Sequence, residues 1–207
     1  MNIKKIHSFS ALVITIFVSI HLLNHLYSIL GAAQHIELMT NLRLIYRNVF
    51  VETILILSVF IQIISGIKLF IDKRKITLTH FDKIQLWSGL YLAVFFTFHL
   101  AAVFIGRHFL NLDTNFYFGV AGLNLFPFNL FFIPYYGLAI LSFFGHIASI
   151  HYKKMKHSIF GLSPRKQSFV ILTFGFILTI ILFYGLTNRF HGIVIPTEYN
   201  LSKWNSF

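Results

Sequence analysis

The chain contains no cysteine, and this absence excludes several kinds of site. Without thiols there can be no disulfide framework, no thiolate metal site and no cysteine-ligated iron-sulfur cluster. Any redox centre held by this protein must therefore use other ligands. Charged residues are also scarce, at 11% of the 207 residues, whereas soluble domains carry roughly a quarter.

What the chain has instead is apolar sequence, with 57% hydrophobic residues and a mean hydropathy of +0.75. These values predict an all-α, polytopic membrane helix bundle that forms a single unit over residues 1–207. Five segments approach the ~20 residues that are needed to cross a bilayer. They are residues 9–30, 50–71, 84–106, 131–152 and 168–187.

The net charge of +11 would favour a nucleic-acid partner in a soluble protein, but in a membrane protein basic loops set the topology. Of the 17 basic residues, 12 fall on the side of the membrane that holds the N-terminus. The other five are Arg43, Arg47, Arg107, Arg189 and Lys203. The positive-inside rule then predicts a cytoplasmic N-terminus in a bacterial inner membrane, or a matrix-side one in a mitochondrial inner membrane. We expect lipid, and no nucleic acid, around this chain.

Several polar residues interrupt the apolar spans. The first span contains the stretch HLLNHL, which places His21 and His25 on one helical face with Asn24 beside them. The third span contributes His99 and the fourth contributes His146. Polar side chains are costly in lipid, so these faces are expected to turn toward the interior of the bundle.

Depth indicates which of these histidines can meet. At ~1.5 Å per residue from the cytoplasmic ends, His21 lies ~18 Å, His25 ~24 Å and His99 ~22 Å into the membrane. His146 lies only ~10 Å from the cytoplasmic end. The first three therefore share a level, whereas His146 reaches His21 only if the helices tilt.

Two imidazoles that face each other in an apolar bundle are the ligand set of a six-coordinate haem b. We therefore predict a metal site formed by His99 with either His21 or His25, with His146 as a competing partner. The unused histidine and Asn24 are expected to orient the ligand or to meet a propionate. Arg43 and Arg47 lie just beyond the first span, where they either pair with haem propionates or anchor the chain at the interface.

The remaining parts carry weaker signals. Seven histidines fall at span ends or in loops, where interfacial or solvated roles are expected: His7, His35, His80, His108, His151, His157 and His191. Residues 107–130 form the longest loop, which is aromatic and is expected at the outer interface, over the bundle mouth, as a re-entrant cap or as a docking surface. Pro127 and Pro134 are expected to mark the start of the fourth span.

A resemblance to a known family rests on residues of the first two spans. The stretches HLLNH (21–25), RLIYR (43–47) and QIISG (62–66), together with Glu52, resemble the membrane cytochrome b subunits of succinate dehydrogenase and fumarate reductase. The likeness covers mainly residues 9–106. It implies a bundle that carries haem b and passes electrons between a membrane quinone and a flavoprotein with an iron-sulfur subunit.

The sequence departs from that family in one respect. The two-haem members with five spans take ligands from the first, second, fourth and fifth spans, but the second and fifth spans here contain no histidine. One haem is therefore expected rather than two. In the second span Ser58, Gln62 and Ser65 form a stripe that either bonds a quinone carbonyl or joins helices.

The leading hypothesis is a haem b membrane anchor subunit for quinone-linked electron transfer. The chain has no flavin or nucleotide fingerprint, so it is at most the membrane subunit of an oxidoreductase complex. Two alternatives stay open at this point. One is a membrane adaptor without redox turnover, and the other is a small transporter or proton-relay bundle.

Overall fold

The computed structural model describes residues 2–74 and 79–200, and these residues form helices without any β-strand. Five helical segments are long and apolar enough to cross a membrane: Ile3–Leu30, Val49–Lys73, His80–Phe109, Asn129–Lys154 and Pro164–Leu186. The predicted all-α membrane bundle with five spans is thus confirmed, with span ends that differ by a few residues. The protein is an integral membrane protein.

The helices follow each other with short connections. In chain order they are α1 (Ile3–Leu26), η1 (Tyr27–Leu30), α2 (Ala32–Tyr46), α3 (Val49–Lys73), α4 (His80–Phe104), η2 (Ile105–Phe109), α5 (Phe116–Asn124), α6 (Asn129–Lys154), α7 (Pro164–Leu186) and η3 (Thr197–Tyr199).

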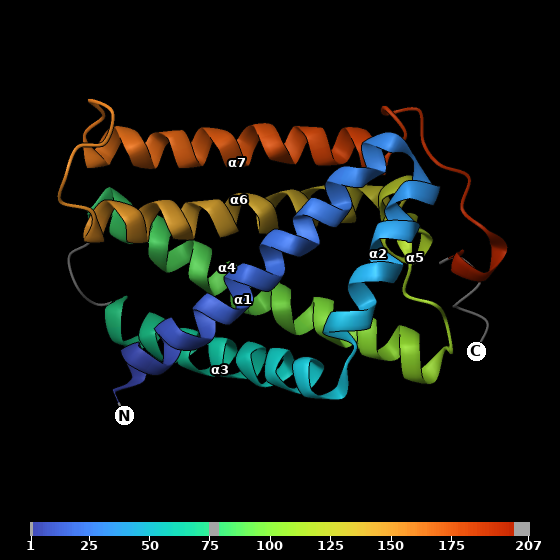
Figure 1. Ribbon diagram of the computed structural model, residues 1–207, viewed down its shortest axis with the longest axis horizontal. Coiled ribbons are helices and arrows are strands. Elements are labelled where there is room, and N and C mark those ends of the chain that lie inside the picture. Colours follow the sequence, from blue (N-terminus) through green and yellow to red (C-terminus); the bar gives the residue numbers. More distant parts are fainter. Residues whose placement is uncertain (1, 75–78, 201–207) are drawn as a thin grey trace.

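Helices α3, α4, α6 and α7 run along the length of the molecule, and α1 crosses in front of them from α3 to α7 (Figure 1). One end of the bundle holds the start of α1, the end of α3, the start of α4 and the connection from α6 to α7. We name it the basic end, because the lysine-rich segments lie there. The opposite end is named the capped end, because α2 and α5 lie across it.

Local sequence explains where the helices begin. The side chain of Asn48 accepts a hydrogen bond from the Phe50 amide at the start of α3, and Thr79 and Asp82 form a reciprocal capping box at the start of α4. Pro164 opens α7, where its fixed φ favours the first turn. Pro134 was expected to mark the start of a span but lies inside α6, one turn after its beginning.

A sharp turn after the first span reverses the chain. Gly31 has a φ of 121°, which side chains with a Cβ rarely adopt, and α2 begins at the next residue. The turn folds α2 back over the end of α1, so residues shortly after the span return toward the bundle interior.

The segment 107–130 is more ordered than a surface loop. It carries α5, whose Phe116, Val120 and Leu123 form a core cluster with Leu182 and Leu186 of α7. The side chain of Asn124 donates to the Leu186 carbonyl at 3.1 Å and accepts from the Ile193 amide at 3.0 Å. The structure thus places this segment over the bundle mouth, which is one of its expected positions.

Candidate functional site: a buried histidine cluster

Two histidines of α1 lie in direct contact inside the bundle. The Nε2 atoms of His21 and His25 are 3.0 Å apart, and their ring centroids are 4.4 Å apart. In neutral imidazoles one of these nitrogens carries a proton and donates it to the other. The four-residue spacing therefore produces a hydrogen-bonded pair and not merely a shared face.

A third histidine, His35, joins the pair from α2. Its Nε2 lies 3.2 Å from Nδ1 of His25 and 3.3 Å from the side-chain amide nitrogen of Asn24. The imidazole is only 2% exposed and packs against the ring of Phe116, with centroids 4.9 Å apart. Burial, and then the positive charge of Arg43, lowers the pKa of His35 to about 4, so this residue is neutral at pH 7.

The sequence reasoning missed His35, which was expected in an interfacial or solvated position. The available signal was the four-residue spacing of His35 and Met39, which are the two buried residues of α2 and share one face. That face turns inward because the turn at Gly31 folds α2 back over α1.

His99 faces the same group from α4. Its ring centroid lies 6.2 Å from that of His21, with an angle of 68° between the ring planes. Phe95 stacks on His99 at 5.1 Å and 13°, and Tyr136 of α6 contacts it at 6.4 Å. The structure thus brings together the three histidines that were expected at one depth.

We name His21, His25, His35 and His99 the histidine cluster. Two of the buried polar atoms in and beside it, the Nδ1 of His35 and the Oδ1 of Asn24, make no hydrogen bond within the part of the chain that is described. Buried polar atoms normally have a partner, so this place has unused capacity for one. Across residues 2–74 and 79–200, no three histidine or acidic side chains converge in the way that would hold a metal ion by protein ligands alone.

His146 lies outside the histidine cluster. Its Nδ1 is 3.3 Å from the Ser88 hydroxyl and 3.1 Å from the Gln85 carbonyl, both on α4. The ring rests against Gly89, where a Cβ would lie 3.0 Å from the imidazole Cε1. Its neighbours are therefore residues of the half of α4 that is nearer to the basic end.

The arginines beyond the first span have acidic or hydroxyl partners at the capped end. Arg43 forms an ion pair with Asp113 at 2.8 Å, and Arg47 donates to the Thr114 hydroxyl at 3.1 Å. Arg107 pairs with Glu52 beside them. Burial, followed by the charges of Arg43 and Arg107, lowers the pKa of Arg47. The expected pairing of Arg43 with a propionate would have to compete with Asp113.

The stripe on α3 joins two helices. The Gln62 amide donates to the His7 carbonyl at 2.5 Å and to the Ser10 hydroxyl at 2.7 Å, both on α1. Ser65 bonds the Nδ1 of His7 at 2.7 Å, and Ser58 is buried with an exposed fraction of 6%. The structure places these side chains in helix contacts, and a quinone role for Ser58 and Gln62 stays a prediction.

Comparisons of this chain with known proteins found no match. No family model matches it, and no curated protein or solved structure matches it. Its function must therefore be inferred from the contacts of its own residues.

Proposed function

We propose that this protein is a haem b-binding membrane subunit that passes electrons between a membrane quinone and a partner oxidoreductase. The observation that carries this proposal is the pair formed by His21 and His99, which face each other from α1 and α4. Two imidazoles that bind one iron at ~2 Å on opposite sides have ring centroids roughly 6 Å apart. The observed separation of 6.2 Å fits that requirement.

The surroundings suit two axial ligands better than a metal ion held by protein alone. A haem needs only two protein nitrogens, because the porphyrin supplies the other four. Phe17 stacks on His21 at 5.7 Å, and Phe95 and Tyr136 flank His99. These rings keep water from the ligands. When bound there, haem b supplies reversible one-electron chemistry.

The other cluster members act on the ligand. His25 bonds the Nε2 of His21, and His21 would give up this bond if it held the iron through that nitrogen. His35 and Asn24 hold His25 from its other side, so its ring keeps its orientation after the exchange. We therefore assign His21 and His99 as ligands and His25, His35 and Asn24 as positioning residues.

The partner in this proposal docks at the basic end. Basic side chains there include Lys4, Lys5, Lys73, Arg74, Lys154, Lys156, Arg165 and Lys166. By the positive-inside rule this end faces the cytoplasm of a bacterium, or the matrix of a mitochondrion. The resemblance to succinate dehydrogenase and fumarate reductase anchors supplies the identity of the partner, a flavoprotein with an iron-sulfur subunit.

The test is the absorption spectrum of the purified protein. We expect a Soret band and a b-type α-band on reduction, and we expect both to disappear in His99→Ala. His108→Ala is the matched control, because His108 is an exposed histidine one turn beyond α4. A colourless wild-type protein from haem-replete cells contradicts the proposal.

A second function is favoured by one specific observation. His21, His25 and His35 form a continuous hydrogen-bonded series of imidazoles, which is the arrangement needed to pass protons. If the protein is colourless but acidifies the interior of liposomes under a proton gradient, and His25→Phe abolishes this flux, the proton-relay function is supported. A colourless protein without flux contradicts both of these functions and leaves the membrane adaptor as the remaining hypothesis.

A further inference from the structure

A groove of about 430 Å³ lies between α1 and α6, beside the basic end. It is lined by Thr15 of α1, by Ile147, Ile150, His151 and Lys154 of α6, and by Met155 directly after α6. The course of α1, which crosses the other spans from α3 to α7 (Figure 1), brings the middle of this helix to the groove. None of the four clustered histidines lines the groove, so it is a separate site.

The α6 wall of the groove changes from apolar to charged along the helix. Ile147, Ile150, His151 and Lys154 have the i, i+3, i+4, i+7 spacing that places side chains on one helical face. At ~1.5 Å per residue this face extends about 10 Å from Ile147 to Lys154. Lys154 is the last residue of a 26-residue span, and ~20 residues already cross the hydrocarbon core. Its ammonium therefore lies at the level of the lipid headgroups, and the two isoleucines lie among the acyl chains.

The Lys154 ammonium is available to an anion from outside the chain. The neighbouring lysine, Lys153, forms an ion pair with Asp82 of α4. Within the described part of the chain Lys154 has no such partner. The sequence also contains no acidic residue between Asp113 and Glu198. The positive charge at the mouth of the groove is thus not neutralised by the protein.

The imidazole beside Lys154 is held in one orientation. The Nε2 of His151 donates to the side-chain oxygen of Gln167 at 2.7 Å. The amide nitrogen of Gln167 donates to the carbonyls of His157 at 3.1 Å and Leu162 at 2.7 Å, so the amide oxygen must face His151. Gln167 is itself buried. The mouth of the groove is therefore built on a fixed hydrogen-bond network.

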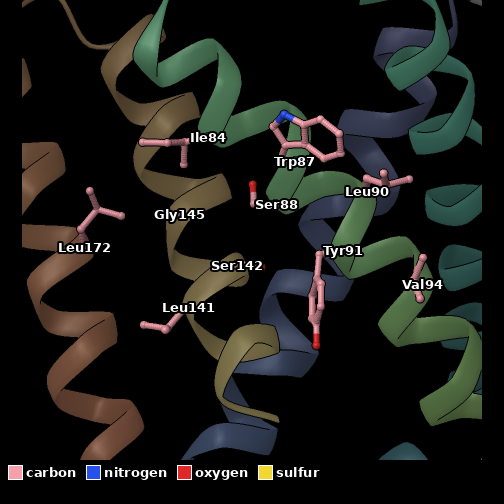
Figure 2. A pocket seen from close by; sticks show the side chains of 10 residues that line it. All are labelled: Ile84, Trp87, Ser88, Leu90, Tyr91, Val94, Leu141, Ser142, Gly145 and Leu172. Carbon is pink, nitrogen blue, oxygen red and sulfur yellow. The ribbon is translucent and has the colours of Figure 1, made fainter. Parts of the chain in front are cut away.

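A larger groove on the opposite side of α6 lacks these polar groups. It has a volume of about 680 Å³ between α4, α6 and α7, and Figure 2 shows Trp87, Tyr91, Leu141 and Leu172 around it. No charged residue lines it, so nothing there selects one lipid headgroup over another. It serves as the control surface for the groove between α1 and α6.

We infer that the groove between α1 and α6 binds one phospholipid with an anionic headgroup. Its phosphate lies at Lys154 and His151, and one acyl chain lies along Ile147 and Ile150. A free phosphate would use the two polar side chains only, and an alkyl chain would use the isoleucines only. In a zwitterionic headgroup the phosphate already has a cation beside it, so it gains less from Lys154. This inference needs no haem and is independent of the proposed function.

Native mass spectrometry of the purified protein counts the lipids that remain bound. The probes are phosphatidylglycerol and phosphatidylcholine with the same acyl chains. We expect one phosphatidylglycerol to bind about fivefold more tightly than phosphatidylcholine, because one lysine near the surface attracts the net negative charge. Lys154→Gln should remove most of this preference.

Two controls separate the groove from the rest of the surface. Lys156→Gln removes the same charge from an exposed lysine outside the groove and should keep most of the preference. Thr15→Leu fills the groove and should lower the affinity for phosphatidylglycerol about tenfold. Ser142→Leu introduces the same side chain into the groove of Figure 2 and should leave that affinity unchanged. Both lysines are exposed, so their variants keep the test valid if Thr15→Leu does not fold.

Four results overturn the inference. The first is equal binding of the two lipids by the wild type. The second is an equal loss of preference in Lys154→Gln and Lys156→Gln, which shows diffuse attraction to the basic end. The third is displacement of phosphatidylglycerol by inorganic phosphate, which shows an anion site without an acyl chain. The fourth is equal affinity of folded Thr15→Leu and Ser142→Leu proteins, which places the lipid elsewhere.

Discussion

The histidine cluster and His146 both lie inside the bundle, and their surroundings differ. In the histidine cluster four imidazoles contact one another among aromatic rings, and the Nδ1 of His35 has no partner among the described residues. His146 is alone, and its Nδ1 is satisfied by a serine and a backbone carbonyl. The difference shows that a membrane histidine must be judged by what its nitrogens contact, since both places have equally apolar sequence around them.

The test with the largest expected effect compares the haem content after substitution of a histidine at each of the two places. We expect His21→Ala to lower the haem content by at least about tenfold, because an axial ligand is lost, and His146→Ala to leave it nearly unchanged. The haem-to-protein ratio of the purified variants, from a pyridine haemochrome assay, measures this. Loss of haem in His146→Ala with retention in His21→Ala would reverse the assignment.

The second test removes the cap that only the histidine cluster has. Phe116 is 2% exposed and contacts His35, so Phe116→Ala should destabilise the fold by about 3–5 kcal/mol. Phe109→Ala is the control, because Phe109 is 78% exposed and should change the stability by less than about 0.5 kcal/mol. Unfolding in mixed micelles followed by circular dichroism gives both values, and equal values would mean that α5 does not cap the site.

A third test uses the pH dependence of stability to distinguish the histidine cluster from the rest of the bundle. The pKa of His35 is about 4 in the folded protein and near 6.5 when unfolded, so the unfolded state binds more protons between these values. Its contribution is fully present above pH 6.5 and is lost as the pH falls toward 4, by up to about 1.4 kcal/mol per pH unit.

The measurement is the melting temperature of haem-free protein at pH 7 and pH 5. The wild type should lose more stability on acidification than His35→Gln, which cannot titrate there. His191→Gln, which changes an exposed histidine near the C-terminus, should behave as the wild type does. An equal loss in all three proteins would mean that His35 does not carry the effect.

The smallest effect concerns the ion pair that ties α2 to the segment before α5. The Arg43 side chain is 13% exposed and that of Asp113 is 50% exposed, so their coupling should be about 0.2–1 kcal/mol. A double-mutant cycle with Arg43→Gln and Asp113→Asn measures it, and it should shrink at high salt. Coupling well above this range would mean that the pair, and not packing, holds α2 over the cluster.

The spans could be predicted because membrane thickness and helix rise are fixed quantities. The same regularity placed His21, His25 and His99 at one depth, and the structure brings them together. His35 could not be placed in this way, since α2 is a short helix whose burial depends on the turn at Gly31 and on Phe116. The partners of Gln62 and Arg43 likewise depend on how distant helices approach each other, which hydropathy does not encode.

The turn at Gly31 also bears on the order in which the chain is made. His21, His25 and His35 lie within fifteen consecutive residues, and the turn lets them meet in space. The ribosome therefore synthesises this half of the site as one short continuous segment. His99 follows two membrane crossings later, and α5 and α6 bring Phe116 and Tyr136 after it. A nascent chain that has inserted only its first two spans therefore displays an open imidazole surface. This surface is closed only in the second half of translation, when α4, α5 and α6 have been made.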